Sequence, residues 1–331
     1  MFIRQLNYLV ALAREQHFGR AAEVCHVSQP ALSAAIRSIE VELGIVIVQR
    51  GRRFQGFTAD GLRVLAWARR VLADCEHLRD EARSNEADPQ GTLRLGAIPA
   101  ALPLVPLLTQ SCLQTYPRIR HGIHTLPAED ILRKLLDYEL DVGLTYMDDP
   151  RLARYQVIPL FRERYVLLAG SREQLNAVGA FTWEVAAQLP LCLLSTNMQC
   201  RAGIDALCAA RDLSLTPQVE TDSLTALCAH VRHSGFYSIV PHSVLCQQEA
   251  GAPLYAHVLQ PVMERDIGLV VRRQDSQGPL LDAALGSFAS LDVQAWADRF
   301  LPAEPARRPR ARRSAPGAPQ VAMGERDHHQ Q

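Results

Sequence analysis

A short stretch near the N-terminus carries side chains suited to reading a nucleic acid. Gln29, Ser33 and Arg37 recur every four residues, so on a helix they lie along one face. An amide, a hydroxyl and a guanidinium at this spacing can bind base edges and phosphates in the major groove of DNA. Pro30 lies beside them in the first turn of the expected helix and joins the candidate DNA-contacting face.

A loop directly downstream adds three arginines, Arg50, Arg52 and Arg53. Guanidinium groups in such a loop can lie against DNA phosphates. Residues 1–58 hold seven arginines against four glutamates, whereas the whole chain has a formal net charge of +0. The positive excess is therefore local to the candidate DNA-binding end.

Two short helices and a wing must position these groups. Ser28 is a suitable N-cap, and a proline two residues later fits the first turn of a helix. The predicted buried stripe of this helix consists of Leu32, Ile36, Ile39 and Leu43. The apolar run 45–48, the arginine loop and a return through Phe57 predict a β-wing. Residues 1–58 thus form a predicted winged helix-turn-helix.

Residues 1–65 resemble the winged helix-turn-helix of LysR-type transcriptional regulators, and the layout suits that family to about residue 300. The matching residues are Arg20-Ala21-Ala22, Val27 to Ser33, Ile39-Glu40, Glu42-Leu43-Gly44, Arg50, Phe57-Thr58 and Gly61. The resemblance implies a sequence-specific regulator of transcription that binds double-stranded promoter or operator DNA. It also implies a small-molecule effector, a homodimer or homotetramer, and contact with RNA polymerase.

A long helix from Thr58 to about Arg83 is expected next, followed by a hinge, so that 59–90 forms a linker and dimerisation segment. Apolar residues recur along this helix at spacings of three and four. They are Leu62, Leu65, Ala68, Leu72, Cys75, Leu78 and Ala82. One such stripe on so long a helix favours pairing with a second copy, while packing on its own domain is the alternative.

From residue 91 to about 300, β-rich runs alternate with helical stretches, which predicts an α/β domain. Two blocks of this kind predict two subdomains, one at about 91–162 and 266–300 and the other at about 163–265. This arrangement resembles the periplasmic-binding-protein-like effector domain of the same family. Ligands of such folds bind beyond the carboxyl ends of the strands.

That rule selects the candidate effector-binding residues. They are Ala100, Ala101, Leu126, Tyr146, Ser195, Thr196, Asn197, Met198 and Asp222. Because backbone amides at helix starts favour anions, the expected effector is a small organic acid or another anion. Thr196 and Asn197 are the residues of the second subdomain that we expect to bind the ligand. The alternative interpretation is that the hydroxyl and amide side chains at 195–197 merely cap a helix.

Redox sensing through Cys200 and Cys208 is the alternative regulatory mechanism, since the family has a peroxide-sensing branch with a cysteine pair in this region. The eight cysteines lack paired metal spacing, so no metal site and no cofactor are expected. The common catalytic motifs are missing from the sequence, so we do not expect an enzyme.

The remaining expectations concern location and the C-terminus. No apolar run approaches the ~18 residues needed to span a bilayer, so no membrane association and a cytoplasmic location are expected. Residues 301–331 are rich in Arg and Pro and predict a disordered tail.

Overall fold

The structure is a computed structural model that describes residues 2–49, 51, 54–83, 89–247, 253–273 and 278–301. Residues 302–331 of the predicted tail and the three loop arginines Arg50, Arg52 and Arg53 lie outside the described residues. No helix in the described ranges is both long and apolar enough to cross a membrane.

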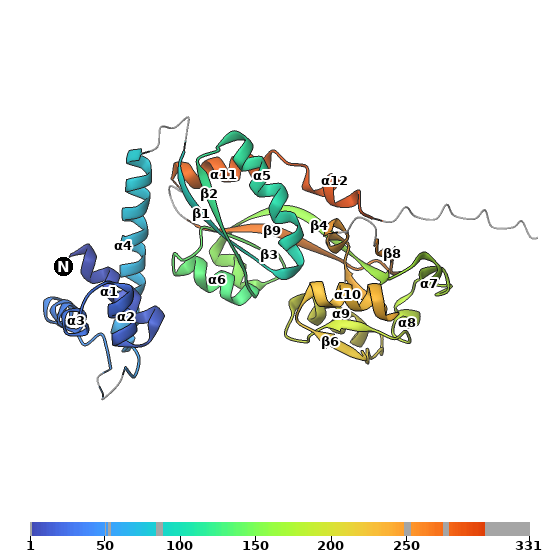
Figure 1. Ribbon diagram of the computed structural model, residues 1–331, viewed down its shortest axis with the longest axis horizontal. Coiled ribbons are helices and arrows are strands. Elements are labelled where there is room, and N and C mark those ends of the chain that lie inside the picture. The colour runs from blue at the N-terminus through green and yellow to red at the C-terminus, as the bar shows by residue number, and fades with distance from the viewer. Residues whose placement is uncertain are drawn as a thin grey trace, which may run out of the picture. The chain divides into compact units, whose positions relative to one another are not determined.

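Three helices form the N-terminal domain, α1 (Ile3–Glu15), α2 (Phe18–Val24) and α3 (Gln29–Leu43), together with the start of α4 (Ala59–Arg83) (Figure 1). Helix α3 begins as predicted, because the Ser28 hydroxyl accepts a hydrogen bond from the Ala31 amide at 3.3 Å. It ends at Gly44, whose φ of 67° is in the left-handed region that glycine adopts easily.

The predicted buried stripe of α3 is wrong at one position. Leu32, Ile36 and Ile39 are buried, but Leu43 is 42% exposed. The fourth buried residue is Glu40, at 7% exposure. The last turn of α3 extends beyond the apolar core, whereas Glu40 faces the wing, where backbone amides satisfy its carboxylate.

The wing is shorter than predicted in the described residues. Its strands meet in one antiparallel bridge between Val48 and Phe57, supported by a hydrogen bond from the Gln49 amide to the Gly56 carbonyl at 3.0 Å. The Thr58 hydroxyl then accepts from the Gly61 amide at 2.9 Å and caps the start of α4, as predicted.

The apolar stripe predicted along α4 divides between two environments. Leu65 and Ala68 are buried in the core of the N-terminal domain, and Leu72 packs against that core. The exposed large apolar side chains of α4 are Leu62, Trp67, Val71 and Leu78. Leu65, Ala68 and Leu72 of the predicted stripe therefore pack within their own domain, whereas Leu62 and Leu78 of the stripe are exposed together with Trp67 and Val71.

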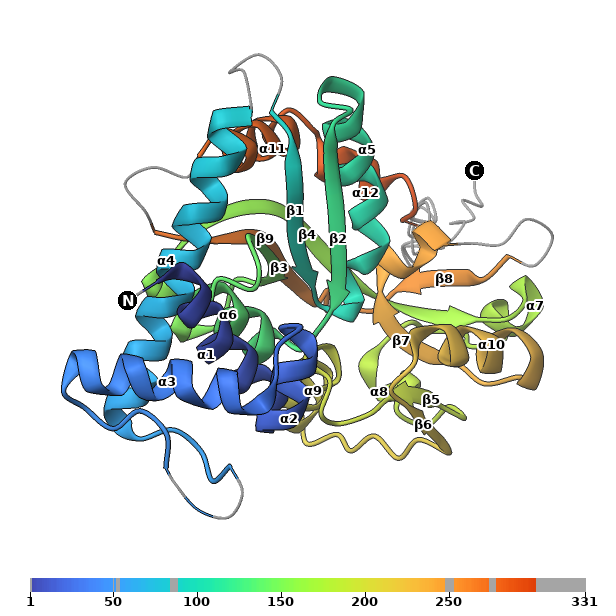
Figure 2. The same cartoon turned by 60° about the vertical axis from the view of Figure 1, so that its left-hand side comes forward.

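The first α/β subdomain is a mixed sheet of β1 (Gly91–Ala97), β2 (Ile119–Thr125), β3 (Val142–Tyr146), β9 (Glu264–Arg272) and the first part of β4 (Tyr155–Ala169). The strand order is β2-β1-β3-β9-β4, with β1 parallel to β2 and β3, and β9 antiparallel to its neighbours. Helices α5 (Val105–Thr115) and α11 (Pro279–Ala289) cover one face and α6 (Ala128–Leu136) the other (Figure 2).

The second subdomain continues from the same long strand. The last part of β4 pairs with β7 (Ser238–Pro241) and β8 (Tyr255–Val258), while β5 (Cys192–Leu194) pairs with β6 (Val219–Thr221). Its main helices are α9 (Gln199–Ala209) and α10 (Leu224–Ser234), with the short α7 (Arg172–Asn176) and α8 (Trp183–Ala186). Helix α12 (Val293–Asp298) packs on β4.

The two subdomains are joined where β4 and β9 run side by side. Arg162, Glu163 and Arg164 of β4 oppose residues 266, 265 and 264 of β9 in antiparallel register. Paired with β9, they form the connection between the subdomains.

Candidate functional site

The outward face of α3 carries most of the predicted DNA-contacting side chains. Gln29, Pro30 and Arg37 are exposed, and Ser33 is half-buried. Exposed Ala34 lies between them on the same face. This face therefore combines two long polar side chains with short ones that would let the helix backbone approach base edges closely.

Glu40 connects α3 to the wing. Its Oε1 accepts hydrogen bonds from the backbone amides of Ile47 and Val48, at 2.9 and 3.1 Å. Both amides belong to residues that are at most 3% exposed. The sequence analysis noted Glu40 only in the family pattern. Its fold role could have been inferred from its place on the buried side of α3, four residues after Ile36.

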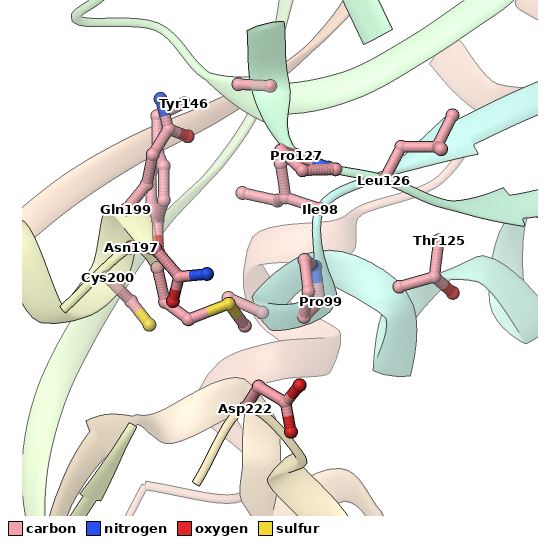
Figure 3. A pocket seen from close by; sticks show the side chains of 13 residues that line it. Ile98, Pro99, Thr125, Leu126, Pro127, Tyr146, Asn197, Gln199, Cys200 and Asp222 are labelled. Carbon is pink, nitrogen blue, oxygen red and sulfur yellow. The ribbon is translucent and has the colours of Figure 1, made fainter. Parts of the chain in front are cut away.

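A cavity of about 230 Å³ lies between the two subdomains, at the carboxyl ends of β1, β2, β3, β5 and β6 (Figure 3). The lining residues from the first subdomain are Ile98, Pro99, Ala100, Thr125, Leu126, Pro127, Ala128 and Tyr146. Those from the second are Asn197, Met198, Gln199, Cys200 and Asp222. The volume is below the range of roughly 300–1,000 Å³ that drug-sized ligands occupy, so it suits a small molecule.

Six of the predicted effector-binding residues line this cavity, namely Ala100, Leu126, Tyr146, Asn197, Met198 and Asp222. Three do not. Ala101 is fully buried in the core, and Ser195 is held in a turn by backbone hydrogen bonds to residues 198 and 221. Thr196 is exposed and outside the lining.

The lining also contains residues that the sequence analysis missed. Gln199 and Cys200 open α9, because this helix begins later than the serine-threonine-asparagine run suggested and has Met198 as its N-cap. The remainder come from the same strand ends as the predicted residues: Ile98, Pro99, Thr125, Pro127 and Ala128. The rule that ligands bind beyond strand ends would have included them if applied two residues more widely.

A buried carboxyl group lies next to this cavity, outside its lining. Glu163 is 0% exposed, and neither carboxylate oxygen has a hydrogen bond partner within the described residues. Burial raises the pKa of Glu163 to about 7, an effect that the nearby Tyr146 and Tyr165 hydroxyls and the Arg265 guanidinium partly oppose. The two tyrosine hydroxyl oxygens are 3.4 Å apart.

Arg265 links both subdomains and lies behind the Tyr146 side of the cavity. Its guanidinium carbon lies 3.4 Å from the centre of the Tyr146 ring. It forms a two-point ion pair with Asp148, with distances of 2.9 and 3.0 Å, and also donates to the Gln199 carbonyl at 3.0 Å. The donors of Arg265 are therefore engaged by the protein itself.

The two cysteines of the redox alternative both lie in α9 and are buried, at 5% and 1% exposure for Cys200 and Cys208. Burial raises the pKa of Cys200 to about 12 and also raises that of Cys208. Both thiols therefore stay protonated near neutral pH, which makes them poor nucleophiles. Within the described ranges no cluster of His, Cys, Asp and Glu could hold a metal ion.

Comparison with known proteins identifies the family. The model described as "LysR substrate binding domain" matches residues 86–290, and that of the "Bacterial regulatory helix-turn-helix protein, lysR family" matches residues 3–62. The chain belongs to the LysR family of bacterial transcriptional regulators. It is a DNA-binding regulator with an N-terminal helix-turn-helix and a C-terminal effector-binding domain, and the predicted family and fold class are confirmed.

Curated relatives of this LysR-type regulator include several peroxide-response proteins. The hydrogen peroxide-inducible genes activator of Pectobacterium carotovorum is 38% identical over 164 residues, 49% of this chain and 54% of that protein. The chain thus matches about half the length of these relatives. The SDS degradation transcriptional activation protein of a Pseudomonas strain is 30% identical over 309 residues, 88% of this chain and 97% of that protein.

Solved structures of family members share the fold over most of the chain. Full-length OxyR from Pseudomonas aeruginosa superimposes with a TM-score of 0.67 and 26% identity, covering 88% of this chain and 99% of that one. CbnR complexed with its target DNA has a TM-score of 0.59 at 21% identity, covering the same shares. At that identity the likeness to CbnR concerns the fold alone.

Proposed function

We propose that this regulator changes its DNA-binding output when a small molecule occupies the cavity between its two α/β subdomains. The observation that carries the proposal is that the cavity wall comes from both subdomains, with Tyr146 on one side and α9 on the other. A ligand that touches both sides favours one arrangement of the subdomains. Its influence is limited to its difference in affinity between the two arrangements, typically ~1–3 kcal/mol.

A matched pair of tryptophan variants tests the location of the effector site. Asn197 lines the cavity and is exposed, so Asn197→Trp should fill the cavity without disturbing the core. Its neighbour Thr196 is equally exposed but outside the lining, so Thr196→Trp is the control. Full-length wild-type protein is first screened by thermal shift against small carboxylates, amines and other metabolites.

Compounds that raise the wild-type unfolding temperature should leave the Asn197→Trp temperature unchanged and still raise that of Thr196→Trp. Compounds that stabilise both variants equally would place the effector elsewhere and contradict the proposal.

We further propose that α3 reads base edges and that the loop arginines contact phosphates. Arg37→Ala should cost about 1–3 kcal/mol at particular base pairs and so relax sequence preference there. Arg52→Ala should weaken binding to all sequences and reduce the salt slope by about one. Selection of binding sites in vitro, followed by titrations at several salt concentrations, separates the two effects. Unchanged preference in Arg37→Ala would contradict the assignment of the recognition helix.

Assembly with a second copy is the simplest explanation for the exposed apolar side chains of α4. Trp67, Val71 and Leu78 are 63%, 37% and 69% exposed on one helix, and water-exposed apolar patches mark interaction surfaces. We propose a homodimer paired through this face, with a homotetramer and contact to RNA polymerase as the family implies. Light scattering from full-length protein measures the assembly.

Redox sensing through Cys200 and Cys208 is the second candidate, favoured by the names of the 38% identical relatives. Two features oppose it. Both thiols are buried with raised pKa values, and eight residues along a helix separate them by about 12 Å, too far for a disulfide unless α9 unwinds. Mass labelling of free thiols before and after mild peroxide treatment would reveal a redox pair.

A further inference from the structure

The charge of the cavity wall restricts the chemistry of its ligand. Among the thirteen lining residues, Asp222 is the only acid, and the set contains no Arg, Lys or His. Asp222 follows β6 directly, and Figure 3 shows its carboxylate pointing into the space between the subdomains. Within the described ranges Asp222 makes no ion pair. A ligand in this cavity therefore meets an unpaired negative charge.

The charged groups just outside the cavity lining do not cancel the negative charge of Asp222. The Arg265 guanidinium lies against the Tyr146 ring, but its nitrogens bind Asp148 and the Gln199 carbonyl. Glu163, buried close to Tyr146 and Cys200, adds a carboxyl group on the same side. The N-terminus of α9 carries a positive partial charge of roughly half a unit, which is less than the full negative charge of Asp222.

The rest of the wall is apolar. Ile98, Pro99, Leu126 and Met198 contribute hydrocarbon or thioether surface. Burial of a small aliphatic group against such a surface is favourable in proportion to its area. Together with the volume of about 230 Å³, this favours a compact ligand with a hydrocarbon body and one polar end.

We propose that the effector carries a protonated amine, which binds the Asp222 carboxylate while its hydrocarbon body packs on the apolar wall. The inference rests on the proposed function, because it takes this cavity as the effector site. It replaces the organic acid expected from the sequence with a ligand whose charge complements the wall.

Three probes of equal chain length test the charge preference, namely hexylamine, 1-hexanol and hexanoate. Each probe is titrated into full-length protein in a calorimeter at pH 7, where the amine is cationic and the acid is anionic. Ligands of this size are expected to bind in roughly the millimolar range. A charge-assisted hydrogen bond to Asp222 should make hexylamine bind about tenfold or more tightly than hexanoate.

Two asparagine variants assign that preference to one residue. Asp222→Asn should weaken hexylamine binding about tenfold and change hexanol binding less than twofold. Asp212→Asn is the control, because Asp212 is an exposed acid of the same subdomain outside the lining. This control should leave the binding of all three probes unchanged.

The result that would overturn the inference is hexanoate binding as tightly as hexylamine, or equal loss of hexylamine affinity in both asparagine variants. Absence of binding by all three probes also overturns it. Asn197→Trp separates this failure from failure of the proposed function. If hexanoate binds best and Asn197→Trp abolishes that binding, the cavity remains the effector site and only the charge assignment is wrong.

Discussion

Replacing Glu40 with leucine is expected to destabilise the N-terminal domain by about 2–5 kcal/mol and to abolish DNA binding. The carboxylate of Glu40 accepts from two buried backbone amides of the wing. Leucine cannot accept a hydrogen bond, so both donors would remain buried and unsatisfied. Each such donor costs roughly 1–3 kcal/mol, and the wing would lose its fixed position beside α3.

Glu40→Gln separates this effect from simple loss of charge. Its amide oxygen can still accept from Ile47 and Val48, so the loss should be about 1 kcal/mol. Glu42→Leu, an exposed position of the same helix, should change stability by less than about 0.5 kcal/mol. Thermal unfolding and DNA titrations of the full-length variants measure both quantities. If Glu40→Leu were as stable as Glu42→Leu, the two amides would not depend on Glu40.

Glu163→Gln is expected to stabilise the effector-binding domain at alkaline pH and to have little effect at acid pH. Burial raises the pKa of Glu163 from 4.5 in its ordinary state to about 7 in the folded protein. Folding therefore favours the protonated form. The stability of the wild type is not penalised by this group below about pH 4.5 and falls as the pH rises through 7. The full penalty is about 3 kcal/mol.

We compare the unfolding temperatures of the variant and the wild type at each pH, because the other titrating groups are the same in both proteins and their effects cancel. Glutamine keeps the shape of Glu163 but does not ionise, so its unfolding temperature should exceed that of the wild type by roughly 6–10 °C at pH 8. At pH 5 the two should differ by roughly 2–3 °C. Glu264→Gln is the control, since Glu264 lies on the adjoining strand with a side chain 35% exposed.

Calorimetry of the full-length proteins at the two pH values measures these temperatures. An equal difference at pH 5 and pH 8 would mean that Glu163 does not titrate in this range. If Glu264→Gln shows the same pH-dependent difference in unfolding temperature, the effect belongs to the surface charges where β4 and β9 connect the subdomains.

The N-terminal domain could be predicted in detail because its signals are local. Ser28 as a cap, the proline after it and Gly44 at the helix end act within one or two turns, so neighbouring residues determine them. The same holds for the Thr58 cap of α4. Leu43 was misassigned because whether the last turn of a helix reaches the core depends on the rest of the domain.

The effector domain was predictable as alternating strands and helices, and the rule for strand ends selected Leu126, Tyr146 and Asp222 from the sequence alone. It misplaced Thr196, because the start of α9 is determined by backbone hydrogen bonds between Ser195, Met198 and β6. The bond from the Ser195 amide to the Thr221 carbonyl joins segments more than twenty residues apart, so no local pattern encodes it.

The sequence by itself determined the family, the helix-turn-helix and the order of the elements, since periodicity, caps and turn residues are properties of adjacent positions. Only the tertiary structure decided which side chains share an environment. It buried Glu163 beside two tyrosines, engaged Arg265 with Asp148, and left Asp222 facing the cavity. The physical reason is that burial and charge pairing depend on contacts between distant segments, and these contacts set the chemistry of the site.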